Sequence, residues 1–147
     1  MALSLNSRVE ILLVEDNPGD VRLAKTALKE AEFENHISVA KDGVEALSFL
    51  RQEGQFEQAP RPDIILLDLN LPRKSGHEVL EEIKADENLK RIPVVVLSTS
   101  SSEEDVSQSY YLRANCYVSK PVDLDEYLET LKTIGLYWSS VVTLPIP

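Results

Sequence analysis

Cysteine and long apolar runs are the features that this sequence most clearly lacks. Cys116 is the single cysteine among 147 residues, so no disulfide can form within the chain. We expect a buried, unreactive thiol, because no metal ligand or redox partner stands near it in the sequence. No apolar stretch reaches the roughly 20 residues of a membrane-spanning helix. Residues 1–10 lack the basic and apolar segments of a secretion signal, so we expect a cytoplasmic protein.

Basic residues are too few for a protein that binds nucleic acid directly. The chain has 15 Lys and Arg against 25 Asp and Glu, which gives a net charge of −10. Direct binding to nucleic acid needs a basic surface, so this charge argues against it. The acidic residues could serve solubility alone, or some of them could be concentrated in one site. The length and the 43% apolar content indicate one globular domain over residues 1–147.

What the sequence does contain is a fivefold alternation of strand-length apolar runs and segments of helical period. The expected strands are residues 9–14, 36–40, 63–68, 92–98 and 116–120. The expected helices are residues 17–32, 41–52, 75–86, 101–113 and 123–138. Asn17, Asp42 and Asp123 are suited to cap helices, Ser and Glu near 102 suggest a capping box, and residues 53–62 read as a surface loop. This order predicts an α/β fold with a doubly wound, parallel, five-stranded sheet.

Polar residues stand where four of the five expected strands end. Glu15 and Asp16 follow the first strand, and Asp68 ends the third. Ser98 and Thr99 end the fourth strand, while Lys120, followed by Pro121, ends the fifth. Functional groups of such sheets gather beyond the carboxyl ends of the strands, so we expect these side chains to meet. Each residue alone would pass for an ordinary loop or strand-end residue, and only their joint placement favours a site.

Three neighbouring carboxylates repel one another unless a cation lies between them. Oxygen ligands suit Mg²⁺, and Mn²⁺ would also fit. His36 and His77 lack the spacing of a zinc site, and we expect both on the surface. Asp68 is the candidate nucleophile for a phosphoryl group, since a carboxylate can form an acyl phosphate. The metal and Lys120 would offset the charge of that group, and Ser98 could donate a hydrogen bond to it.

Four motifs, in order and with matching spacing, resemble the receiver domain of two-component response regulators. They are VEDN (14–17), LLDLNLPRKSG (66–76), VVVLSTS (94–100) and YVSKP (117–121). The resemblance spans residues 8–134 and implies the flavodoxin-like receiver fold, with residues 135–147 as an apolar tail. The resemblance implies that Asp68 is the phosphoacceptor and that Lys120 pairs with the phosphoryl group. It implies that the metal is held by Glu15, Asp16 (the more direct ligand), Asp68 and the Asn70 carbonyl. It further implies that Ser98 and Tyr117 are switch residues and that Gly76 lies in the turn before the third helix.

Two positions depart from the common family pattern. Glu15 stands where many members have aspartate, so its longer side chain could reach the metal through water. Thr99 replaces a smaller residue, often alanine, which leaves the rate of dephosphorylation open. Residues 34–76 and 89–100 resemble, more narrowly, the small cyanobacterial regulators that partner phytochrome-type histidine kinases. That resemblance implies such a kinase as the phosphodonor.

The expected function is therefore a phosphorylation switch rather than a turnover enzyme. Phosphorylation would change the surface formed by helix 101–113, strand 116–120 and helix 123–138, and a downstream protein of unknown identity would read it. An aspartate-based phosphatase or phosphotransferase is a second hypothesis, although it usually needs an acid where Asn70 stands. A phosphorylation-independent interaction module is a third. The apolar tail could pack on its own domain or contact a second copy, and we expect a homodimer.

Overall fold

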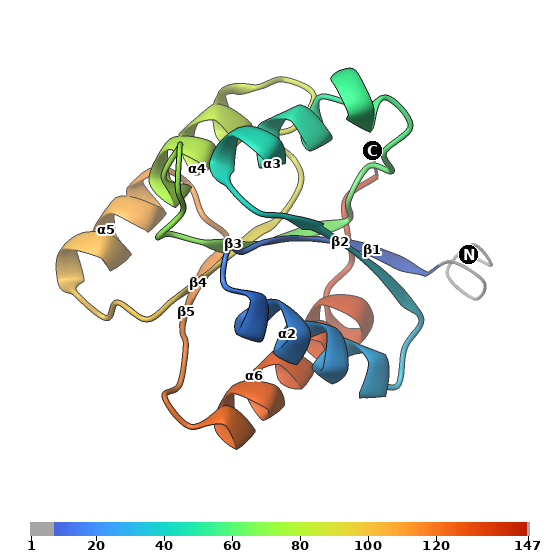
Figure 1. Ribbon diagram of the computed structural model, residues 1–147, viewed down its shortest axis with the longest axis vertical. Helices are drawn as coiled ribbons and strands as arrows, with labels where there is room; N and C mark the ends of the chain where they lie inside the picture. Colours follow the sequence, from blue (N-terminus) through green and yellow to red (C-terminus); the bar gives the residue numbers. More distant parts are fainter. Residues whose placement is uncertain (1–7, 147) are drawn as a thin grey trace.

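The computed structural model describes residues 8–146 as a layered α/β structure around one parallel sheet (Figure 1). The strands are β1 (Val9–Val14), β2 (Asn35–Ala40), β3 (Ile64–Asp68), β4 (Val94–Ser98) and β5 (Cys116–Ser119). Their order in the sheet is β2-β1-β3-β4-β5, and all four neighbouring pairs are parallel. This confirms the predicted parallel sheet and brings all five carboxyl ends to one edge.

A helix follows each strand, and the helices cover both faces of the sheet. They are α2 (Pro18–Glu30), α3 (Gly43–Leu50), α4 (Gly76–Ala85), α5 (Glu103–Tyr111) and α6 (Leu124–Leu136). Helices α2 and α6 lie on one face, while α3, α4 and α5 lie on the other (Figure 1). Such crossovers are right-handed in nearly all parallel sheets, which sends successive helices to the face that the strand order requires.

Each face of the sheet has its own apolar core. Within β1, Leu12 and Val14 join the core under α3 and α4, whereas Ile11 and Leu13 join the core under α2 and α6. All five residues of β3 are buried, because this strand lies in the middle of the sheet with helices on both sides. A strand covered on both faces can be apolar throughout, which explains the unbroken IILL run.

The helix caps largely follow the sequence. Asn17, Asp42 and Asp123 each accept a hydrogen bond from a backbone N–H of the helix that they precede. The expected capping box at α5 is only half formed: Ser102 caps the helix, but the third position holds the shorter Asp105. The reciprocal pair occurs instead at α4, between Ser75 and Glu78.

Within residues 8–146, two short helical turns lie outside the five main helices. The loop at 53–62 contains a 3₁₀ turn, Gly54–Phe56, whose Phe56 ring lies 5.5 Å from Phe49 and packs against the core. After α6, residues Tyr137–Val141 form a π-helical turn, and Trp138 packs against the core under α2 and α6. The tail then crosses to the far side of the sheet (Figure 1), where Pro145 and Ile146 line a small pocket together with Pro62.

The tail thus packs at least in part on its own domain. Residues 1–7, where no secretion signal was expected, and Pro147 lie outside the described residues. Within residues 8–146, the structure contains no helix with the length and apolar character needed to cross a membrane.

Candidate functional site

A hollow of about 380 Å³ opens at the carboxyl edge of the sheet. Glu15 and Asp16 reach it from the end of β1, Asp68 from the end of β3, and Lys120 from the end of β5. The hollow is lined by Glu15, Asp16, Asn17, Pro18, Asp20, Asp68, Asn70, Thr99 and Lys120. Residues separated by as many as 105 positions in the sequence are therefore neighbours, as the strand-end argument predicted.

Glu15, Asp16 and Asp68 form a cluster in which one oxygen from each lies within 4.8 Å of the others. Asp16 is exposed, whereas Glu15 and Asp68 are buried. Burial raises the pKa of Glu15 to about 7; the negative charge of Asp68 adds to the rise, and the hydrogen bond from Lys120 opposes it. Three hard oxygen ligands around one hollow fit a Mg²⁺ ion, whose charge would relieve this repulsion.

Lys120 is the positive charge of the hollow, and its side chain is 5% exposed. Its Nζ donates to Glu15 Oε1 at 2.6 Å and to Asp20 Oδ2 at 2.9 Å. Asp68 Oδ2 lies farther away, at 3.6 Å. Burial alone would lower the pKa of Lys120, but the hydrogen bond to Glu15 and the surrounding negative charges hold it above its ordinary value. The ammonium is therefore charged throughout the physiological pH range.

The loop after β3 is fixed by close backbone contacts. The Asn70 N–H donates to Asp68 Oδ1 at 3.4 Å, and Asn70 lies in the wall of the hollow. Gly76 donates its N–H to Leu69 O at 2.9 Å. A Cβ at Gly76 would stand 2.4 Å from Asp68 O, so glycine is needed there for close approach. We expected Gly76 in a turn before the helix; it is instead the first residue of α4.

The two expected switch residues lie beside the hollow rather than in its wall. Ser98 is fully buried at the end of β4, where its Oγ accepts a hydrogen bond from the Ser100 N–H at 3.1 Å. Thr99, the next residue, is exposed and lines the hollow. Tyr117 is half-buried, and its hydroxyl donates to Ser100 O at 2.8 Å. Ser98 and Tyr117 are thus both tied to the β4–α5 loop through Ser100.

Two residues of the site, Asp20 and Tyr127, were not predicted from the sequence. Asp20 lies in the first turn of α2, where an acidic residue is ordinarily explained by the helix dipole. Tyr127 of α6 is 3% exposed, and its ring lies beneath Lys120, with 5.9 Å between Nζ and the ring centre. Asp20 could have been suspected, because it stands four residues after Asp16, in the first turn of the helix that follows β1. Nothing in the sequence marks Tyr127 as different from a core residue.

The remaining candidates lie away from the hollow. His36 is exposed, as expected, and pairs with Glu10 at 2.9 Å. The expectation of a surface position for His77 is wrong: it is half-buried between α4 and α5, with Nε2 3.1 Å from Ser109 Oγ. Cys116 is half-buried rather than buried, and burial raises the pKa of its thiol, which agrees with low reactivity.

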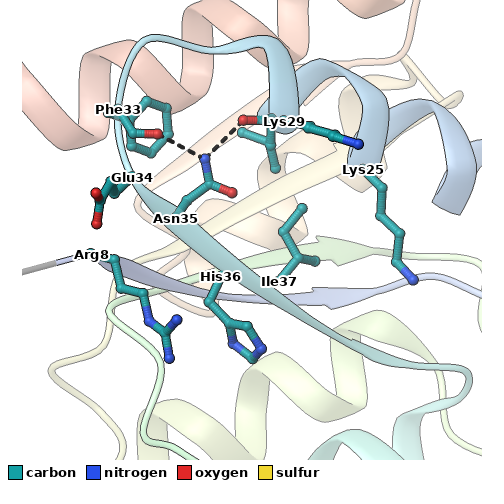
Figure 2. A pocket seen from close by; sticks show the side chains of 9 residues that line it. Arg8, Lys25, Lys29, Phe33, Glu34, Asn35, His36 and Ile37 are labelled. Carbon is teal, nitrogen blue, oxygen red and sulfur yellow. Dashed lines mark hydrogen bonds between the residues drawn. The ribbon is translucent and has the colours of Figure 1, made fainter.

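A second hollow, of about 440 Å³, lies at the β2 edge (Figure 2). Lys25 and Lys29 of α2 flank it on one side of the strand, with Arg8 and His36 on the other. At its rear, the Asn35 side chain donates to Leu28 O at 2.8 Å and to Phe33 O at 3.2 Å, closing the turn between α2 and β2. This hollow contains no carboxylate cluster and lies away from the strand ends that supply Asp68 and Lys120.

The fold and the acidic hollow define a class of signalling protein, and comparison with known sequences agrees. The family model for the response regulator receiver domain matches residues 11–132, so the chain belongs to that family. It is 49% identical to response regulator Rcp1 of Synechocystis over 92% of both chains.

Two solved structures are also close relatives. The phosphorylated cyanobacterial phytochrome response regulator RcpA has 50% identity and a TM-score of 0.92, over 95% of this chain and all of that chain. The Mn²⁺-bound form of Rcp1 has 48% identity and a TM-score of 0.90, over 94% of this chain and 99% of that chain. Receiver domains bind Mg²⁺, and the cluster of Glu15, Asp16 and Asp68 supplies suitable ligands here.

Proposed function

We propose that this protein accepts a phosphoryl group on Asp68 from a phytochrome-type histidine kinase. The observation that carries the proposal is that Asp68 shares one hollow with Glu15, Asp16 and Lys120, and that its Oδ2 lies 3.6 Å from Lys120 Nζ. The kinase type is supported by the relationship to cyanobacterial phytochrome response regulators. A partner of this kind would place the protein in the cytoplasm, and residues 1–147 would act as one receiver unit with a core at 8–134.

In the proposed reaction, a carboxylate oxygen of Asp68 forms a bond to phosphorus as the P–N bond of the donor phosphohistidine breaks. Glu15, Asp16, Asp68 and the Asn70 carbonyl would hold Mg²⁺, or Mn²⁺ in its place; the ion would offset charge on the phosphoryl oxygens. Lys120 supplies the protein's own positive charge at the same position. The chain would promote its own phosphorylation and dephosphorylation, with small donors as well as with the kinase, and would not turn over a separate substrate.

The switch would pass from the phosphoryl group to the β4–α5 loop. Ser98 lies at the end of the strand next to β3, and Tyr117 is bonded to Ser100 in the same loop. Movement of the Ser98 hydroxyl toward the phosphoryl group would disturb its bond with the Ser100 N–H and so loosen the anchor of Tyr117. The surface of α5, β5 and α6 would change as a result, and a downstream protein would bind it.

The same surface is our proposed homodimer interface. Tyr111, Val122 and Leu124, which belong to this surface, are at least two-thirds exposed. Exposed apolar side chains occur at protein contact sites, and these three support the proposed interface. Sedimentation velocity of the wild type and of Tyr111→Ser tests this idea, since an 81% exposed side chain can be changed without loss of core packing. A wild type that sediments as a monomer, with and without phosphorylation, would rule the dimer out.

Phosphotransfer itself is tested with a phytochrome-type histidine kinase labelled on its histidine with ³²P. The wild type should take up label in the presence of Mg²⁺ and lose that ability in EDTA. Asp68→Asn should take up none, because it keeps the shape of the side chain and removes the nucleophile. Asp125→Asn, an exposed acid in the first turn of α6, is the matched control and should be labelled normally.

Labelling of Asp68→Asn would contradict the proposed phosphoacceptor. Equal labelling by histidine kinases unrelated to phytochromes would contradict the proposed kinase type and leave the phosphoacceptor in place.

A further inference from the structure

Asp20 contacts Lys120 without belonging to the acidic cluster. Its Oδ2 accepts a hydrogen bond from Lys120 Nζ at 2.9 Å and it lines the hollow, while the cluster consists of Glu15, Asp16 and Asp68. Its own backbone N–H is held by the Asn17 side chain at 3.0 Å. The carboxylate is therefore carried by a fixed helix turn and aimed at the ammonium that the phosphoryl group is to meet.

The two carboxylates that hold Lys120 differ in what their release would cost. The Glu15 side chain is 3% exposed, so losing Lys120 would leave a buried carboxylate without its counter-charge. The Asp20 side chain is 29% exposed, so water can replace the lysine at small cost. If one of these pairs must break, it is the pair between Asp20 and Lys120.

A phosphoryl group on Asp68 would compete with these two carboxylates for Lys120. Lys120 Nζ is 3.6 Å from Asp68 Oδ2, which is longer than a hydrogen bond, while two of its three donors are directed at Glu15 and Asp20. Glu15 stands at the end of β1, the strand paired with β3. Asp20 stands on α2 instead, outside the strands that carry Glu15 and Asp68.

We propose that Asp20 is a positioning residue that holds Lys120 while Asp68 is unmodified and releases it when a phosphoryl group arrives. This inference rests on the proposed function of Asp68. It makes Asp20 a competitor of the phosphoryl group for one ammonium. Asp20 therefore weakens the binding of any phosphoryl-like anion at Asp68 and slows phosphorylation, and it acts through Lys120.

The test is the affinity for beryllofluoride, which coordinates an aspartate carboxylate in the presence of Mg²⁺ and imitates the phosphoryl group. Binding is measured by ¹⁹F NMR on the wild type, Asp20→Asn, Lys120→Met and the double variant. Asp20→Asn should bind about threefold more tightly or better, the value of one partly exposed ion pair. In the Lys120→Met background the same change should have no effect, because no ammonium remains for which Asp20 and the anion could compete.

Asp125→Asn is the matched control, since it removes an acid from the first turn of another helix that follows a strand at the same edge. It should leave the affinity unchanged. An unchanged or weaker affinity for Asp20→Asn would overturn the inference, as would an equal gain in the Lys120→Met background. Circular dichroism shows whether Lys120→Met folds; if it does not, the comparison of Asp20→Asn with the wild type decides. A wild type that binds no beryllofluoride would overturn the proposed function itself.

Discussion

Lys84 and Lys120 lie at opposite ends of the central sheet, and each donates its ammonium hydrogens to several oxygens. At the amino end, Lys84 Nζ donates to Lys90 O, Ile92 O and Asn115 Oδ1, all of which are neutral. Burial lowers the pKa of Lys84. At the carboxyl end, carboxylates surround Lys120, and its pKa is raised although it is buried.

The difference shows that the same residue type has neutral partners at one edge of the sheet and acidic partners at the other. Lys84 joins the end of α4 to the segments that precede β4 and β5, and its neutral partners leave this cluster with the single positive charge of the lysine. Around Lys120 the carboxylates of Glu15, Asp20 and Asp68 outnumber the single cation. A site with surplus negative charge can still take up a metal ion, whereas the positive charge of the Lys84 cluster would repel one.

Among the variants that test the difference between Lys84 and Lys120, we expect the largest effect from Lys120→Met. Loss of a charge that acts on the transferring group should slow labelling by acetyl phosphate about 100-fold or more. The variant also leaves Glu15 and Asp68 without their cation, so Mg²⁺ should raise its melting temperature more than that of the wild type. Labelling rates and thermal unfolding with and without Mg²⁺ check both statements. Normal labelling would remove Lys120 from the mechanism.

Gly76→Ala probes the same edge through packing instead of charge. The added Cβ would lie 2.4 Å from Asp68 O and 2.5 Å from Leu69 Cα, so the backbone has to move. We expect a loss of about 2–3 kcal/mol in the free energy of unfolding, as for other overpacked positions. Gly19→Ala is the control, because its Cβ meets only the Asn17 side chain, at 3.2 Å. Denaturant unfolding measures both, and equal stability of the two variants would contradict the argument.

Lys84→Met should show that the role of Lys84 differs from that of Lys120. It removes three hydrogen bonds to neutral acceptors near the surface, and we expect a loss of about 1–2 kcal/mol in stability. Labelling of Asp68 should stay at the wild-type rate, because Lys84 lies at the opposite end of the sheet. Urea unfolding and acetyl phosphate labelling measure the two effects. A variant with wild-type stability but slow labelling would reverse the assignment of roles.

We expect the smallest effect on stability from the replacement of Glu82, whose ion pairs lie at the surface. Glu82 on α4 accepts hydrogen bonds from Lys74 and Arg51, and the bond from Lys74 lowers its pKa below the usual value. A lowered pKa contributes stability above the pKa of the unfolded chain, and that contribution is lost as the pH falls through the folded-state pKa. Glu82→Gln should therefore cost less than about 1 kcal/mol near pH 7.

At a pH below the folded-state pKa of Glu82, this cost should disappear. Chemical denaturation of the wild type and of Glu82→Gln at several pH values measures it. A cost that persisted in acid would mean that Glu82 acts through packing.

Much of the site could be predicted because parallel strands present their carboxyl ends together. To predict that Glu15, Asp16, Asp68 and Lys120 meet, only the positions of three apolar runs and that rule were needed. Asp20 and His77 could not be placed in this way. Asp20 has an ordinary role as an acid in a first helical turn, and the half-burial of His77 arises where α4 meets α5, which neither helix encodes alone.

By itself, the sequence of this protein determined the elements, most of the caps and the identity of the charged residues at the strand ends. Those properties depend on neighbouring residues, and local spacing records them. Only the tertiary structure decided that Asp20 joins these charges: its pair with Lys120 links positions 100 residues apart. It also required glycine at position 76, because α4 begins against the backbone of Asp68. Such contacts depend on strand order and helix placement, which follow from packing of the whole chain and not from any local pattern.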